Sequence, residues 1–118
     1  MDVLIIHRED STLHAIQEKF DLGGWRVSKA SGSLEGLELA RQQEFDLILC
    51  GVDLPVMSGI ELIRTLRTDS INKNAPIFLV AKEKPGPQEG KLVEQLEANI
   101  KENKNLLADG VVRFGWLD

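Results

Sequence analysis

The residues of this sequence best suited to chemistry are polar side chains at or near the ends of apolar runs. They are His7, Arg8, Glu9, Asp10, Asp53 and Arg113. Carboxylates can bind a hard cation or form an acyl phosphate, and arginine guanidiniums bind phosphate or carboxylate through paired hydrogen bonds. If the fold brings these residues together, they predict either an internal network of ion pairs or a site for a small anion.

His7 and Cys50 could each have a chemical role, but a structural role is the stronger hypothesis for both. His7 could titrate near neutral pH, but a single histidine at the end of a strand is usually a hydrogen-bonded side chain. Cys50 is the only cysteine, which excludes an internal disulfide. Its place in an apolar run predicts a small buried hydrophobe rather than a reactive thiol.

Apolar runs and helical patterns alternate along the chain and define the elements that must position these residues. Strands are predicted at 3–6, 25–29, 46–50, 76–81 and 111–114, and helical patterns begin near 10, 33, 59 and 91. Asp10 or Ser11 is the expected N-cap of the first helix, and Ser33 that of the second. This alternation predicts a doubly wound α/β fold, a parallel sheet with helices on both faces. Ligands of such a sheet bind beyond the carboxyl ends of its strands.

The most specific segment is 46–67, with the sequence DLILCGVDLPVMSGIELIRTLR. It predicts a buried strand, a loop punctuated by Pro55 and Gly59, and an amphipathic helix. The segment resembles the third strand and third helix of the receiver domain of bacterial two-component response regulators. The resemblance covers nearly the whole chain and implies one flavodoxin-like domain over residues 1–118, with five strands in the order 2-1-3-4-5.

The same resemblance indicates a degenerate receiver, because each residue of the phosphorylation machinery is replaced. In the family, an aspartate four residues before the loop proline accepts the phosphoryl group. Here that position is Gly51, which has no side chain to react. The acidic pair that helps to hold Mg²⁺ is replaced by His7 and Arg8, so no metal site is expected. In the last two strands, Ala81 replaces the serine or threonine of the family, and Arg113 replaces its lysine. Gly110 replaces the aromatic relay residue.

Three functions are compatible with such a pocket. The leading hypothesis is a pseudo-receiver, a signalling module rather than an enzyme, which acts by protein contact without phosphorylation. In that case the arginines pair with Asp53, Asp10 or Glu9. The first alternative is a sensor for a small anion or nucleotide that is bound by Arg8 and Arg113. The second is a receiver phosphorylated at a displaced carboxylate such as Asp53.

Two departures near the C-terminus predict where a partner binds. The pattern from 91 to 107 predicts a fourth helix of about 17 residues, longer than is usual in receivers. Only GWLD follows Phe114, so no fifth helix is expected; the chain is either stand-alone or the N-terminal module of a longer regulator, truncated before that helix. The uncovered face is expected to dock a protein partner, an output domain or a second copy of the chain. Its predicted residues are Leu92, Leu96, Ile100, Val111, Val112, Trp116 and Leu117.

Composition and charge argue against several other classes of protein. The 118 residues are 42% hydrophobic and 28% charged, which suits one globular core. A net charge of −5 argues against direct binding to nucleic acid, which needs clustered basic residues. No apolar run is long enough to span a membrane, and a cytoplasmic location is expected. No cofactor is expected.

Overall fold

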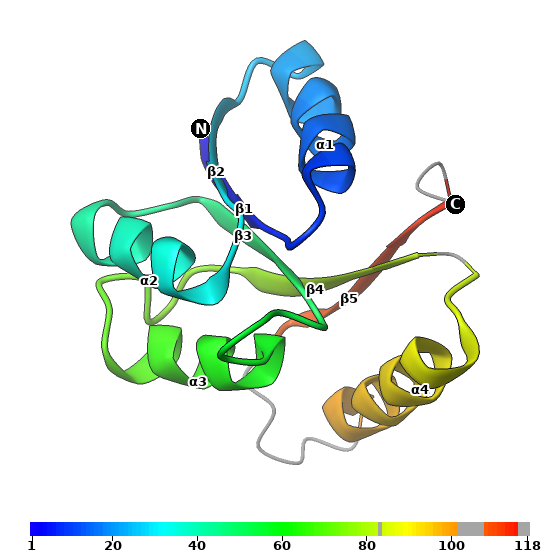
Figure 1. Ribbon diagram of the computed structural model, residues 1–118. Helices are drawn as coiled ribbons and strands as arrows, with labels where there is room; N and C mark the ends of the chain where they lie inside the picture. Colours follow the sequence, from blue (N-terminus) through cyan, green and yellow to red (C-terminus); the bar gives the residue numbers. More distant parts are fainter. Residues whose placement is uncertain (83, 102–107, 116–118) are drawn as a thin grey trace.

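Five short strands form one parallel sheet. The computed structural model describes residues 1–82, 84–101 and 108–115, and it orders the strands β2-β1-β3-β4-β5 (Figure 1). The strands are β1 (Asp2–Ile6), β2 (Arg26–Ala30), β3 (Leu47–Gly51), β4 (Ile77–Lys82) and β5 (Gly110–Phe114). The predicted strand order is confirmed, and every predicted strand lies within one residue of the observed bounds.

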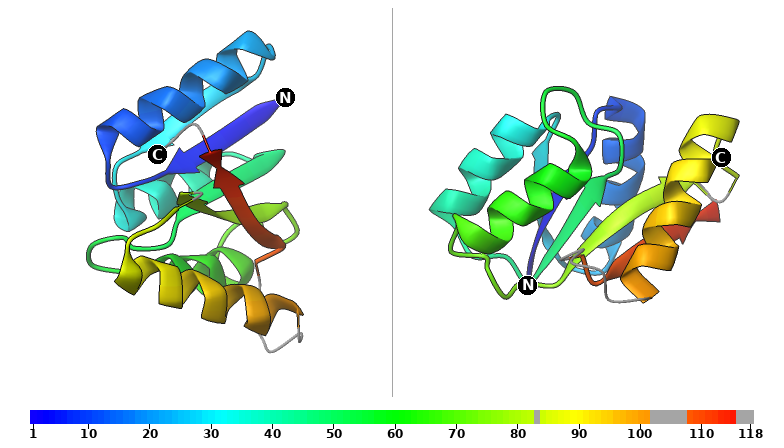
Figure 2. Two further views of the ribbon diagram at one scale, coloured as in Figure 1. Left: turned by 90° about the vertical axis from the view of Figure 1, so that its right-hand side faces the viewer. Right: turned by 90° about the horizontal axis from the view of Figure 1, so that it is seen from below.

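Four helices lie on the two faces of this sheet. They are α1 (Asp10–Leu22), α2 (Ser33–Gln42), α3 (Gly59–Thr68) and α4 (Pro87–Lys101). Figures 1 and 2 show α1 on one face, while α2, α3 and α4 lie side by side on the other. In the described residues, α1 is therefore the only helix on its face of the sheet.

The predicted starts of α1, α2 and α3 are confirmed, whereas the caps of α1 and α2 and the start of α4 differ from the predicted ones. Asp10 and Ser33 are the first residues of α1 and α2, and the residues before them make no side-chain cap. Ser58 instead caps α3, where its Oγ accepts from the Glu61 N–H at 3.3 Å. Helix α4 begins at Pro87, four residues before the predicted start, because proline suits the first turn, where no amide donor is needed. Its predicted end at 107 lies outside the described residues.

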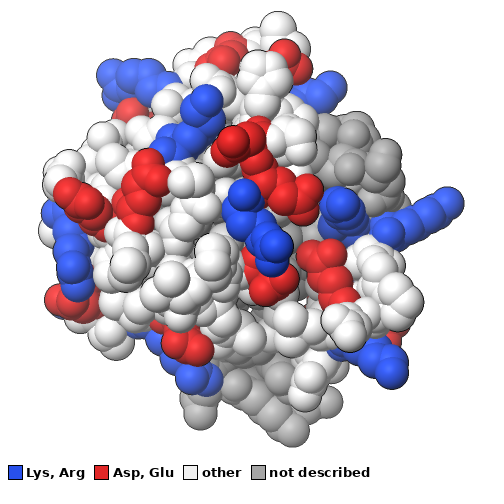
Figure 3. Space-filling view, viewed as in Figure 1, with Lys and Arg blue, Asp and Glu red and all other residues white. Residues whose placement is uncertain are grey.

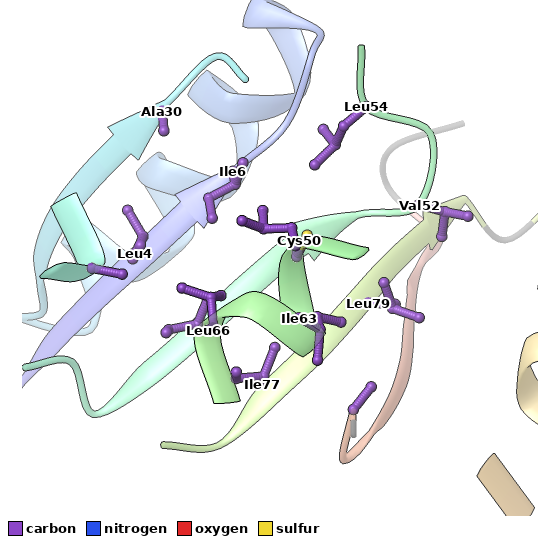
Figure 4. Close-up of a cluster of buried hydrophobic side chains, with 14 of the residues drawn as sticks. Leu4, Ile6, Ala30, Cys50, Val52, Leu54, Ile63, Leu66, Ile77 and Leu79 are labelled. Atoms are coloured by element: carbon purple, nitrogen blue, oxygen red, sulfur yellow. The ribbon is translucent and has the colours of Figure 1, made fainter. Parts of the chain in front are cut away.

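Alternate residues of the strands fill two apolar clusters, one on each face. The larger cluster lies beneath α2, α3 and α4 and includes Ile6, Cys50 and Leu66 (Figure 4). The smaller cluster lies beneath α1, with Val3, Ile5 and Ile16. Cys50 is fully buried, as predicted, and burial raises the pKa of its thiol to about 12. It is therefore a core residue and not a nucleophile at neutral pH.

One buried polar side chain ties the far end of the sheet together. Asn72 is 2% exposed; its Oδ1 accepts from the Phe45 N–H, and its Nδ2 donates to the carbonyls of Ala40 and Gln43. These bonds fix the chain between α2 and β3, at the end of the sheet opposite to the pocket described next.

Candidate functional site

A pocket of about 350 Å³ lies at the carboxyl ends of β1 and β3, where the first turns of α4 close one side of it. This is the edge at which the fold predicts a ligand. The lining residues are His7, Arg8, Glu9, Val52, Asp53, Gln88, Glu89 and Leu92. Three carboxylates, one guanidinium and one imidazole therefore share the lining. Figure 3 shows acidic and basic side chains interspersed on the drawn face, without a patch of one sign.

The His7 ring, which lines the pocket, packs against Gly51 at the end of β3. A Cβ added at Gly51 would lie 3.0 Å from His7 Cδ2 and 3.4 Å from a methyl group of Leu54. The imidazole would therefore have to shift slightly to admit a Cβ at position 51. The N-terminus of α3 also packs closely against Gly51, because a Cβ added at Gly59 would lie 2.3 Å from the Gly51 carbonyl oxygen.

The mouth of the pocket is crossed by an ion pair between Arg8 and Asp53. Arg8 Nη1 donates to Asp53 Oδ2 at 2.9 Å, which confirms the predicted pairing of this arginine with a neighbouring carboxylate. The side chains are 53% and 69% exposed, so solvent screens the pair. The pair joins the loop after β1 to the loop after β3 and adds little stability.

His7 is held in one orientation by the backbone of the following loop. Its Nδ1 accepts from the Glu9 N–H at 3.1 Å, which assigns the proton of the neutral ring to Nε2. The half-buried position lowers the pKa of His7 below its ordinary value, chiefly through desolvation; Glu9 opposes this shift, while Lys82 and Arg8 add to it. The ring is therefore neutral at pH 7, the state in which it can accept that bond.

Arg113 lies outside the pocket lining, which corrects its predicted place beside Arg8. Alternate residues of β5 face opposite sides of the sheet, and Arg113 faces α4, where it forms an ion pair with Glu97. Ala81 is buried in the core at 2% exposure, and Gly110 lies against the ring of Phe78. The structure thus does not bring the two arginines together around a common anion.

Magnesium does not fit this pocket. The carboxylate of Asp53 already accepts from Arg8, and a cation placed there would meet the guanidinium of that arginine. Within the described ranges, no three His, Cys, Asp or Glu side chains come together in a way that could hold a metal ion. Glu9 lines the pocket, whereas Asp10 serves as the first residue of α1 and is not part of the lining.

Sequence reasoning missed Gln88 and Glu89, which line the pocket from the first turn of α4. The signal that could have found them is Pro87, since a proline after a Gly-containing loop marks a helix start.

The predicted docking face is only partly exposed. Leu92 is 37% exposed, and Ile100 and Val111 are partly buried against the larger cluster. Leu96 is 2% exposed because it packs into the core beneath α4, so its predicted place on a docking face is corrected. Val112 is half-buried on the opposite face of β5. Trp116 and Leu117 lie outside the described residues.

Residues 3–102 match the family model described as the response regulator receiver domain. The chain belongs to this family. Its receiver domain is similar to the cell cycle transcriptional regulator CtrA of Caulobacter vibrioides, at 36% identity over 81 residues, which are 69% of this chain and 34% of CtrA. It is also similar to the polar-differentiation response regulator DivK of Brucella ovis, at 28% identity over 66% of this chain and 63% of DivK. The chain therefore spans about a third of CtrA and less than two thirds of DivK.

Solved structures show the same receiver fold. The chemotaxis protein CheY4 of Vibrio cholerae matches with a TM-score of 0.75 and 24% identity, over 97% of this chain and 86% of CheY4. The receiver domain of the sensor histidine kinase PA1611 of Pseudomonas aeruginosa, which was crystallised with magnesium in its active site cleft, matches with a TM-score of 0.72 and 16% identity, over 97% of this chain and 84% of that one. None of the helices in the described part of this receiver is long and apolar enough to cross a membrane.

Proposed function

We propose that this receiver domain transmits a signal by protein contact and is not phosphorylated. The observation that carries the proposal is the packing of the His7 ring over Gly51. An acyl phosphate needs a carboxylate at the end of β3 and open space above it. Gly51 at the end of β3 has no side chain to react, and a Cβ added there would lie 3.0 Å from His7 Cδ2.

The loops around the pocket are tied to each other by side chains in place of a metal ion and a phosphoryl group. Arg8 joins the loop after β1 to Asp53 in the loop after β3. His7 joins the end of β1 to the start of α1 through Glu9. A pocket closed in this way favours one conformation, so we propose that the domain's output depends on which partner is present and not on a chemical switch.

The face formed by α4 and β5 is the proposed contact surface. Leu92, Ile100 and Val111 contribute apolar area to it, and the Arg113–Glu97 pair joins the two elements beneath. The proposed occupant is a protein partner or an output domain, and a second copy of the chain would produce a homodimer. Leu92→Glu should weaken this contact and leave the fold intact, because that side chain is already 37% exposed. Light scattering of both proteins across a dilution series checks for the homodimer.

Phosphorylation at a displaced carboxylate is the candidate that the proposal must exclude. Asp53, two residues after Gly51, is one such carboxylate, and its Oδ2 already accepts from Arg8. The chain should be incubated with acetyl phosphate and Mg²⁺ and its intact mass measured, with Asp53→Asn and Asp10→Asn variants treated in parallel. We expect no added phosphoryl group in any of the three. A mass gain in the natural chain that disappears in Asp53→Asn would identify the displaced acceptor and contradict the proposal.

A further inference from the structure

A strained turn places an apolar side chain in solvent beside the pocket. Val56 has a φ of 71°, and the Met57 N–H donates to the Pro55 carbonyl at 2.8 Å, so these three residues form a tight γ-turn. A β-branched residue adopts a positive φ at a cost in free energy that glycine or asparagine would largely avoid. The valine side chain is nevertheless 87% exposed. Because the side chain is exposed, packing within the folded chain does not offset the free-energy cost of the positive φ.

The loop that carries this turn is anchored on both sides. Leu54 is buried at 6% exposure, and the Gly59 N–H donates to the Val52 carbonyl at 3.2 Å. Ser33, the first residue of α2, donates through Oγ to the Pro55 carbonyl at 3.1 Å. The valine is therefore held out at the tip of a fixed loop, in the manner of a preorganised contact residue.

A second exposed apolar side chain stands on the element that anchors the loop. Leu34 follows Ser33 in α2 and is 59% exposed. The exposed charged residues in the first two turns of the two adjoining helices are Glu35 and Glu38 in α2, and Glu61 and Arg64 in α3. Leu34 and Val56 therefore lie on neighbouring segments with mainly acidic residues around them, and Figure 2 shows α2 on the opposite side of α3 from α4.

We propose that Leu34 and Val56 form a docking patch for a basic amphipathic segment of a partner protein. The apolar side chains of that segment would cover the valine and leucine, and its lysines or arginines would face Glu35, Glu38 and Glu61. A patch of a few hundred Å² is below the size of a stable interface and suits a transient contact. Because α3 separates this patch from the face formed by α4 and β5, the domain can hold one partner at each end of the helical layer.

The test uses a synthetic helical peptide of leucine and lysine, and a control peptide with glutamate in place of lysine. Each peptide is titrated into the ¹⁵N-labelled chain. The lysine peptide should shift the amides of residues 33–38 and 54–61 in a saturable way, and the glutamate peptide should not. Leu34→Ser and Val56→Gly should each weaken the binding about tenfold, the effect of uncovering one apolar side chain. Leu22→Ser is the matched control, because Leu22 is 86% exposed at the end of α1, and it should bind as the natural chain does.

The melting temperature of Val56→Gly separates this proposal from a role in folding. Glycine relieves the positive φ, so this variant should melt at a higher temperature while it binds the peptide less well. A lower melting temperature would show that Val56 supports the fold and would overturn the proposal. Shifts that lie mainly on α4, or binding that Leu34→Ser leaves unchanged, would also overturn it. So would shifts of the patch amides with protein concentration alone, because the occupant would then be a second copy of the chain. None of these outcomes bears on whether the domain is phosphorylated.

Discussion

The substitution of Gly51 by alanine tests whether His7 fills the place of the missing acceptor. The new Cβ would lie 3.0 Å from His7 Cδ2, which is too close unless the ring moves. The ring is fixed by its bond to the Glu9 N–H, so the contact should be costly. The same substitution in a His7→Ala background meets no ring, and the remaining contact to Leu54 at 3.4 Å is ordinary.

The expected magnitudes follow from two opposing effects. Overpacking by one methyl group costs about 1–3 kcal/mol, while replacing a glycine within a strand by alanine gains about 0.5–1 kcal/mol. Gly51→Ala alone should therefore lower the free energy of unfolding by about 0.5–2 kcal/mol. In the His7→Ala background it should raise that free energy by about 0.5–1 kcal/mol, which gives a coupling of about 1–3 kcal/mol between the two positions.

Urea unfolding of the four proteins, followed by tryptophan fluorescence, measures this coupling. Gly36→Ala serves as a control, because its added Cβ would lie 2.6 Å from Ile6 Cδ1, away from the histidine ring. It should destabilise the chain by the same amount with either residue at position 7. An equal effect of Gly51→Ala in both backgrounds would refute the packing of His7 over Gly51.

Three further predictions concern the polar groups of the fold. Arg8→Ala should lower the free energy of unfolding by less than about 1 kcal/mol, because both side chains of its ion pair are more than half exposed, and about 1 M NaCl should remove the difference. Asn72→Ala should cost more, about 1–3 kcal/mol in urea unfolding, because it leaves the buried Phe45 N–H without its acceptor. His7 should make the fold sensitive to acid: its folded pKa is lowered, so as pH falls below the ordinary value of 6.5 the unfolded chain gains a proton that the folded chain does not, and stability falls until the folded pKa is reached. His7→Asn should flatten this part of the stability profile, and a profile unchanged by the substitution would count against the burial of the ring.

Most of the strands were predictable because they contain short apolar runs, whereas β2, with the sequence RVSKA, is more exposed. Val3 to Ile6 and Ile48 to Gly51 are buried on both faces, so their sequences carry a strong signal. The helix caps were harder to predict, because a cap depends on backbone geometry as much as on residue type. Ser33 illustrates this: it has the side chain of a cap but lies one residue inside α2 and donates to the neighbouring loop.

The sequence predicted which residues form the candidate site better than it predicted the contacts between them. The resemblance placed His7, Arg8, Gly51 and Asp53 at one edge of the sheet, and the structure brings them together. The sequence could not show that the imidazole covers Gly51, since this depends on the bond from the Glu9 N–H. Arg113 was misplaced because its position was carried over from the family, whereas its side chain here is drawn to Glu97 on α4.

We propose that the pocket has no place for a metal ion and a phosphoryl group. The most direct measurement is a titration of the ¹⁵N-labelled chain with Mg²⁺ and then beryllofluoride, an analogue of the phosphoryl group, while the amides of His7, Gly51, Asp53 and Ala81 are observed. We expect that these signals do not shift, because Asp53 is paired with Arg8 and the His7 ring packs against Gly51. Saturable shifts of these amides that need both Mg²⁺ and beryllofluoride would contradict it.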